Sequence, residues 1–294
     1  MKNVIMTGAT GMIGSLVLKH LLQSDEIESV TCFLRRKTGI ESNKLIEIIN
    51  KDFENYDDLD EHFKRKDICY YCLGVYTGTV KRDLFRKITV DYTAAFSNKL
   101  KEHSPECTFC FLSGAGADRK EKSWVAFSKD KGIAENALIK LKFEQLYIVR
   151  PAYIYPVEQR KAPTKSYAFM RKVYPLMNKC YSKGVITSTV LAHAIFRLGL
   201  KGGKKVTYEN KELKQFEEEQ TELIKKEIEK KKRKKRKEKK LKKKQEKEKE
   251  NEKENENENE NEIEDEIEKV DENEKEEKEE EEKKEIKKKK KKKN

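Results

Sequence analysis

The stretch Thr7-Gly8-Ala9-Thr10-Gly11-Met12-Ile13-Gly14 decides the fold of this chain. It follows the short apolar run Asn3–Met6 and opens an amphipathic segment that continues to Gln23. A strand, a glycine-rich turn and a helix are expected in that order. The start of such a helix offers free N–H groups and a positive dipole end, which together favour an anion such as a phosphate.

Each glycine of this stretch has its own expected role. Gly8 allows the tight turn, Gly11 lets the backbone approach a pyrophosphate, and Gly14 lets the helix pack closely on the strand. The alternative is a glycine-rich turn in another kind of α/β protein. We expect the pattern to bind a dinucleotide through Gly8, Thr10, Gly11, Met12, Ile13 and Gly14.

The chain up to about residue 210 alternates apolar runs with helix-length amphipathic segments. Such alternation is typical of a parallel sheet with crossover helices, here a Rossmann-type doubly wound α/β domain. The predicted strands are Asn3–Met6, Ser29–Leu34, Leu45–Ile49, Ile68–Leu73, Thr108–Leu112 and Leu146–Val149. The predicted helices between them are Gly11–Gln23, Val80–Glu102 and Ser123–Leu141.

Beyond Pro151 the alternation becomes irregular. Two helices are predicted, Thr164–Lys179 and Ser188–Leu198, the second with Ser188 or Thr189 as its N-cap. We expect them to form a small lobe beside the open end of the sheet, where a substrate would bind. The first domain is therefore residues 1–210, and residues 211–294 form a low-complexity tail that is disordered or partly helical.

The tail carries nearly equal numbers of basic and acidic residues, so almost all of the net charge of +13 belongs to residues 1–210. A basic cluster, Lys231–Lys237, resembles a nuclear-localisation or polyanion-binding segment, although a solvated low-complexity tract is the favoured reading. The N-terminus lacks the features of a signal peptide, and no apolar run is long enough to span a bilayer. We expect a cytoplasmic protein, with nuclear entry through the tail as a further option.

The cysteine pairs Cys69/Cys72 and Cys107/Cys110 have a spacing that can indicate zinc. Both pairs lie in strand-like apolar runs, where positions i and i+3 face opposite sides of the sheet. We therefore expect buried free cysteines and no metal site.

The end of the second strand favours NADP(H). NAD-binding domains place an acidic residue there for the ribose 2′-hydroxyl, whereas this chain has Arg35 and Arg36. Guanidinium groups suit a 2′-phosphate, because their planar donors match phosphate oxygens. Two solvated arginines are the alternative.

The order TGATGMIG, FLRR, KDF, CLG, VDY, FLSGAGAD, KGIAEN and VRPAYIYP resembles the atypical short-chain dehydrogenase/reductases. Within them it is most similar to the Tat-interacting-protein-like oxidoreductases, over about residues 2–210. The resemblance implies that Lys131 holds the nicotinamide ribose and that Ser113 lies at or next to the catalytic serine. It implies further cofactor contacts at Asp52, Phe53, Leu73, Gly74 and Tyr153.

The sequence departs from this family at a residue that takes part in the chemistry. The general-acid tyrosine expected four residues before Lys131 is replaced by Phe127, whose ring has no proton to donate. The candidate substitute donors are Tyr76, Tyr153, Tyr155 and Ser128. Two functions remain open: an NADPH-dependent reductase of a small carbonyl compound, and a nucleotide-sensing protein that binds a regulatory partner. Either can act as a monomer or a homodimer.

Overall fold

The computed structural model describes residues 1–158, 162, 164–181, 184–233, 235–239, 275, 278 and 284. The chain divides into two units, Met1–Leu223 and Ile224–Asn294. In the second unit, residues 224–233, 235–239, 275, 278 and 284 are helical. The rest of the predicted tail lies outside the described residues.

The first unit contains a seven-stranded sheet in the order β3-β2-β1-β4-β5-β6-β9. All of its neighbouring strands are parallel. The strands are β1 (Lys2–Thr7), β2 (Ile27–Leu34), β3 (Leu45–Ile49), β4 (Ile68–Tyr71), β5 (Thr108–Leu112), β6 (Leu146–Arg150) and β9 (Thr207–Glu209). The first six occupy the predicted positions, and the order reverses between β1 and β4.

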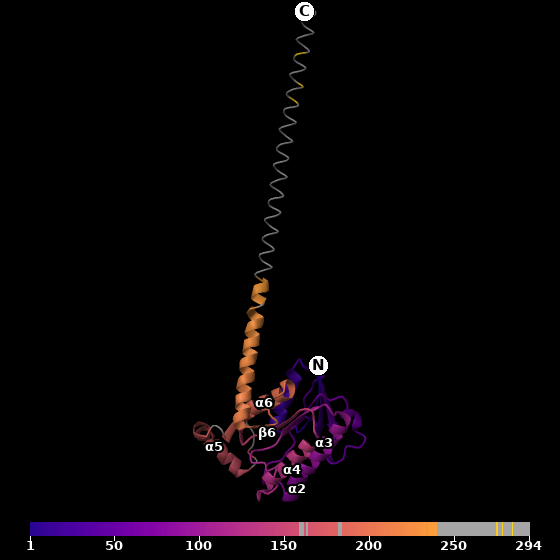
Figure 1. Ribbon diagram of the computed structural model, residues 1–294, viewed down its shortest axis with the longest axis vertical. Helices are drawn as coiled ribbons and strands as arrows, with labels where there is room; N and C mark the ends of the chain where they lie inside the picture. The colour runs from indigo at the N-terminus through magenta and orange to yellow at the C-terminus, as the bar shows by residue number, and fades with distance from the viewer. Residues whose placement is uncertain are drawn as a thin grey trace, which may run out of the picture. The chain divides into compact units, whose positions relative to one another are not determined.

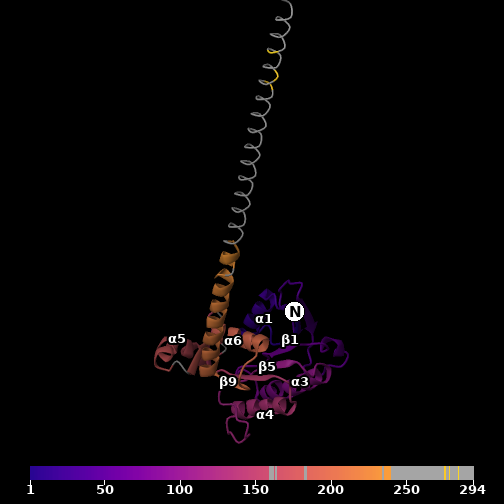
Figure 2. The same cartoon turned by 45° about the horizontal axis from the view of Figure 1, so that its top comes forward.

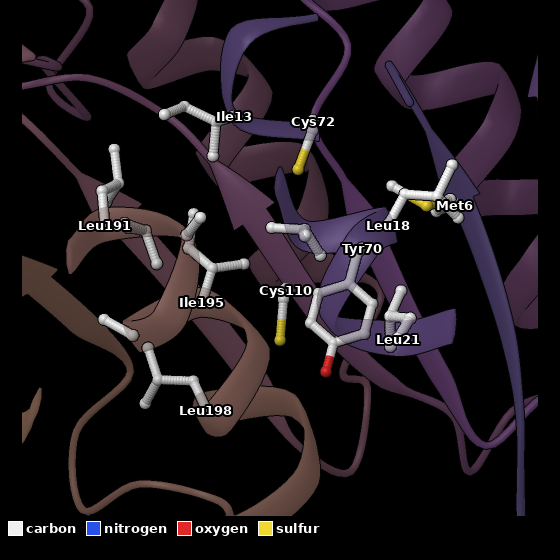
Figure 3. Close-up of a cluster of buried hydrophobic side chains, with 14 of the residues drawn as sticks. Met6, Ile13, Leu18, Leu21, Tyr70, Cys72, Cys110, Leu191, Ile195 and Leu198 are labelled. Carbon is white, nitrogen blue, oxygen red and sulfur yellow. The ribbon is translucent and has the colours of Figure 1, made fainter. Parts of the chain in front are cut away.

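Helices cover both faces of the sheet (Figures 1 and 2). On one face α1 (Met12–Gln23) and α6 (Ser188–Lys201) pack with alternate strand residues such as Met6. Figure 3 shows this core, in which Leu18 of α1 and Ile195 of α6 lie around strand side chains. On the other face α3 (Tyr92–His103) and α4 (Ala126–Lys140) form the second core. The predicted doubly wound fold is confirmed.

The long helix predicted at Val80–Glu102 consists of three segments. The α-helix α2 (Arg82–Arg86) is followed by one wider turn, η2 (Lys87–Asp91), which leads directly into α3. A short 3-10 helix, η1 (Asp60–His62), precedes β4. The wider turn contains buried Ile88, Thr89 and Val90 and packs against α4.

The lobe at the side of the sheet is built from other elements than those predicted. It contains β7 (Tyr153–Tyr155), its parallel partner β8 (Val185–Thr187) and helix α5 (Lys165–Cys180). Helix α6 was expected there but covers the sheet beside α1, because its apolar face is wide enough to be buried. Its N-cap is Thr187, whose side chain accepts a hydrogen bond from the Val190 N–H.

The first unit extends beyond residue 210. Residues 210–223 are helical, and Leu213 and Phe216 are buried in the same core as α1 and α6. These two apolar side chains attach the segment to the domain.

In each of the two pairs of neighbouring cysteines, the two members lie on opposite faces of the sheet, as the strand geometry requires. Cys69 and Cys107 belong to one core, while Cys72 and Cys110 belong to the other. Burial raises the pKa of the Cys72 thiol to about 12. These thiols therefore stay protonated and act as small apolar side chains.

Candidate functional site

A cavity of about 390 Å³ lies at the carboxyl ends of β1, β2 and β4. This is the end of the sheet where the strand order reverses, which is the usual ligand position in open α/β sheets. Its lining residues are Gly8, Thr10, Phe33, Leu34, Arg35, Arg36, Phe53 and Leu73. Four segments of the chain thus meet around one space: the glycine turn after β1, the end of β2, the loop after β3 and the loop after β4.

The glycine turn between β1 and α1 requires glycine at its key positions. Gly8 has a φ of +73°, and a Cβ there would lie 2.4 Å from the Cys72 carbonyl carbon and oxygen. At Gly14 a Cβ would lie 2.1 Å from the Gly8 carbonyl oxygen. Helix α1 therefore rests directly on the turn, and the turn rests on the backbone just after β4.

The N-terminus of α1 is open to an anion. Its N-cap, Gly11, supplies no side-chain hydrogen bond, and the first helical turn of α1 contains no acidic residue. The first amides of an α-helix have no partner within the helix, so the amides of Met12, Ile13 and Gly14 can bind a phosphate group.

Arg35 and Arg36 follow β2 directly and line the same cavity. Both side chains are exposed, and within the described part of the chain neither forms an ion pair. Two uncompensated guanidiniums that share the cavity with Gly8 and Thr10 of the glycine turn give it a positive potential. The residues present therefore fit a dinucleotide with several phosphate groups.

Phe53 and Asp52 behave differently. Phe53 is 2% exposed, lines the cavity and stacks on Tyr92 with ring centroids 5.8 Å apart. The Asp52 carboxylate instead accepts a hydrogen bond from the Glu54 N–H at 3.0 Å, and Asp52 does not line the cavity. Phe33 and Leu34 line it without having been predicted, and their only sequence signal is their position just before Arg35.

Lys131 is held inside the domain by α4. Its Nζ donates to the Leu112 carbonyl at 3.1 Å and lies 5.0 Å from the centroid of the Phe111 ring. Burial lowers the pKa of Lys131 to about 8, against the raising effect of Glu135 and Cys72. The lysine is thus fixed at the end of β5.

The Ser113 hydroxyl is hydrogen-bonded within a buried ion-pair network. It donates to Glu135 at 2.5 Å, and Arg119 and Arg150 also donate to this carboxylate. Burial acts to raise the pKa of Glu135, but the hydrogen bonds and the two arginine charges bring it below its ordinary value. Sequence reasoning did not single out Glu135, which is 0% exposed.

Phe127 faces Gly114 rather than Ser113. A Cβ on Gly114 would lie 2.5 Å from Cζ of Phe127, and the phenyl ring is also 6.2 Å from the Phe85 ring. The phenyl group therefore fills the space in front of residue 114, and no hydroxyl stands at either position.

The remaining predicted residues lie toward the lobe. Gly74 follows Leu73 and is exposed. Tyr153 is half-buried in β7, and its hydroxyl has no hydrogen-bond partner among the described residues. The Tyr76 hydroxyl approaches the Met12 sulfur at 3.9 Å, and its ring contacts Tyr167 of α5. Tyrosine hydroxyls thus occur where α1, the loop after β4 and the lobe adjoin.

The parallel sheet with its reversal point, the glycine turn and the open helix N-terminus define a Rossmann-type dinucleotide-binding domain. Residues 8–192 match the family model described as NAD(P)H-binding, and the chain belongs to this family. The matched range includes every residue that lines the cavity.

Two relatives support the predicted resemblance to atypical short-chain dehydrogenase/reductases, which is confirmed. The chain is 28% identical to Protein HTATIP2 of Rattus norvegicus, over 64% of this chain and 77% of that protein. It is 30% identical to the mitochondrial Protein FMP52 of Meyerozyma guilliermondii, over 51% of this chain and 64% of that protein.

Solved structures share the fold at low identity. The yeast methylglyoxal/isovaleraldehyde reductase Gre2, complexed with NADPH, has a TM-score of 0.52 and 17% identity, over 67% of this chain and 73% of that chain. The Bordetella bronchiseptica enzyme WbmH, in complex with NAD+, has a TM-score of 0.53 and 15% identity, over 71% of this chain and 75% of that chain. The fold thus accommodates either nucleotide.

Two observations concern the predicted location. Within the described residues, no helix combines the length and the apolar character needed to cross a bilayer. However, fungal relatives carry the word mitochondrial in their names, which does not fit the predicted cytoplasmic or nuclear location.

Proposed function

We propose that this chain is an NADP(H)-dependent oxidoreductase that reduces a small carbonyl compound. The observation that carries the proposal is the cavity in which the glycine turn faces both Arg35 and Arg36. The α1 N-terminus would bind the pyrophosphate, and the guanidiniums would bind the 2′-phosphate that distinguishes NADP(H) from NAD(H). Phe53 would pack against the adenine.

The reaction would take place beside Lys131. Bound NADPH supplies the hydride. We assign to Lys131 the binding of the nicotinamide ribose hydroxyls, as the family resemblance implies. Its Nζ is fixed at the end of β5 and, among the described residues, has one hydrogen-bond acceptor, the Leu112 carbonyl.

The proton donor would be non-standard. Ser113 is occupied by Glu135, and Phe127 has no acidic proton. Of the tyrosines considered, we assign the proton transfer to Tyr153, because its hydroxyl has no hydrogen-bond partner in the part of the chain that the structure describes. Burial raises the pKa of Tyr153 while the Arg171 charge lowers it, so the phenol stays protonated and can donate.

Calorimetric titration with NADPH and NADH tests the nucleotide assignment. We expect Arg35→Ala to weaken NADPH binding by about tenfold or more and to leave NADH binding unchanged, since only NADPH carries the 2′-phosphate. The nearby Lys37→Ala variant is the control. Equal losses for both nucleotides would mean that Arg35 does not recognise that phosphate.

Turnover of a panel of small aldehydes and ketones with NADPH tests the reaction. We expect Tyr153→Phe to reduce kcat while nucleotide binding is retained. If the wild-type protein turns over none of them and Phe127→Tyr creates activity, the chain is not a reductase by this route.

A second function is favoured by Phe127. Its ring packs on Gly114, and it stands where the family has its general-acid tyrosine. In that case the chain would be an NADPH-sensing protein whose nucleotide changes its affinity for a regulatory partner. Affinity capture with and without NADPH distinguishes it, because identical partners under both conditions would exclude nucleotide sensing.

A further inference from the structure

Helix α5 exposes a regular stripe of alternating basic and apolar side chains. Lys165, Phe169, Lys172, Leu176 and Lys179 follow one another at spacings of four and three residues, which places them on one helical face. Phe169 is 63% exposed and Leu176 is 65% exposed. The three lysines are exposed as well.

The opposite face of α5 attaches the helix to the lobe. Tyr174 stacks on Tyr155 of β7 with ring centroids 3.8 Å apart. About two turns earlier, Tyr167 contacts the Tyr76 ring. Because these contacts hold the inner face, the exposed stripe is a surface that the first unit itself leaves uncovered (α5 in Figures 1 and 2).

The charge around this stripe is of one sign. The sequence contains no aspartate or glutamate between Glu158 and Glu209, whereas lysine and arginine recur throughout that range. Within the described part of the chain, Lys165, Lys172 and Lys179 form no ion pair. Their charge is therefore available to a negatively charged partner.

We propose that α5 lies flat on an anionic lipid bilayer, with Phe169 and Leu176 inserted at the boundary of headgroups and acyl chains. The lysines between them would extend along the surface and bind the anionic headgroups. Large apolar side chains alternating with cations on a convex helix face suit this boundary. An acidic protein would satisfy the lysines and would leave both apolar side chains without a defined pocket.

This surface carries a native cysteine that can be labelled with a fluorophore. Cys180 lies one turn after Leu176 and is exposed, while the other five cysteines of the chain are buried. An environment-sensitive fluorophore such as NBD, attached through maleimide, will therefore label Cys180 selectively. Its emission shifts to the blue when the dye enters a bilayer, so it reports the position of α5 and not of the tail.

The experiment uses the full chain labelled at Cys180 and vesicles of phosphatidylcholine and phosphatidylserine in a ratio of about three to one. We expect a blue shift with these vesicles and none with pure phosphatidylcholine. The double variant Phe169→Ser/Leu176→Ser should abolish the shift, and replacing the three lysines by glutamine should weaken binding by about tenfold or more.

Helix α4 offers matched controls. Ile139 is 40% exposed there, and Lys129 and Lys140 are exposed too. Ile139→Ser and the double variant Lys129→Gln/Lys140→Gln should behave like the wild-type protein, and circular dichroism will verify that each variant is folded.

Three results would overturn the proposal. The labelled protein could sediment with vesicles without a blue shift, which would assign binding to the tail. The folded Phe169→Ser/Leu176→Ser variant could retain the full shift. The dye could respond to polyglutamate and not to vesicles, which would indicate an acidic protein partner.

Discussion

The contact at Gly14 makes the first turn sensitive to a single methyl group. A Cβ there would lie 2.1 Å from the Gly8 carbonyl oxygen, so α1 or the turn must move. We expect Gly14→Ala to lower the free energy of unfolding by about 1–3 kcal/mol and to weaken nucleotide binding. Thermal unfolding and calorimetry measure the two effects. Gly74→Ala is the stability control, since a Cβ at Gly74 meets nothing within 4 Å.

Lys131 should leave a signature in the pH dependence of stability. Its pKa is about 8 in the folded domain, below its ordinary value of 10.5, so the unfolded chain binds more protons between these two values. The lysine therefore lowers stability below pH 8, and this penalty disappears as the pH rises to 10.5.

The comparison with Lys131→Met isolates this effect from other titrating groups. We expect the stability of Lys131→Met relative to wild type to decrease by a few kcal/mol as the pH rises through that window. Urea unfolding at several pH values measures it. A constant difference across the window would mean that Lys131 titrates normally.

Residue-level reasoning from the sequence named several residues that line the cavity, and they are the ones that backbone geometry places. Gly8, Thr10, Arg35 and Arg36 line the cavity because a motif and a strand end place them there. The direction of the Ser113 hydroxyl was not predictable. It depends on how α4 brings Glu135 against β5, and no local pattern encodes that packing.

At the scale of elements, the helix that begins at residue 210 is attached by two apolar side chains. Leu213 is 0% exposed and Phe216 is 9% exposed, whereas Leu223 is 53% exposed. We expect Leu213→Ala to cost about 2–5 kcal/mol of stability, and Leu223→Ala to change it by less than about 0.5 kcal/mol. Urea denaturation compares them, and equal effects would mean that this helix does not pack on the core.

Strands with long apolar runs were predictable, and the short ones were not. The runs ICYY and TFCFL are buried on both faces and stand out in the sequence. By contrast, β7, β8 and β9 have three residues each and become strands through their partners. For the same reason α6 was assigned to the lobe, since its packing on α1 is a long-range contact.

At the scale of the whole molecule, the residues that line the cavity all belong to the first unit. A chain that ends at Leu223 should therefore gain as much stability from NADPH as the full chain. At a concentration of about 100 times Kd the gain is about 2.7 kcal/mol, which thermal unfolding will detect. A smaller gain in the shortened chain would assign part of the nucleotide site to residues 224–294.

The position of β9 has a consequence for biosynthesis. This strand pairs with β6, yet the chain must first complete the lobe and α6 before Thr207–Glu209 exist. While the nascent polypeptide is still emerging from the ribosome, the β6 edge is therefore open to pairing with other chains. Co-translational protection by a chaperone would matter most during that interval, and it would become unnecessary once β9 and the helix after it have docked.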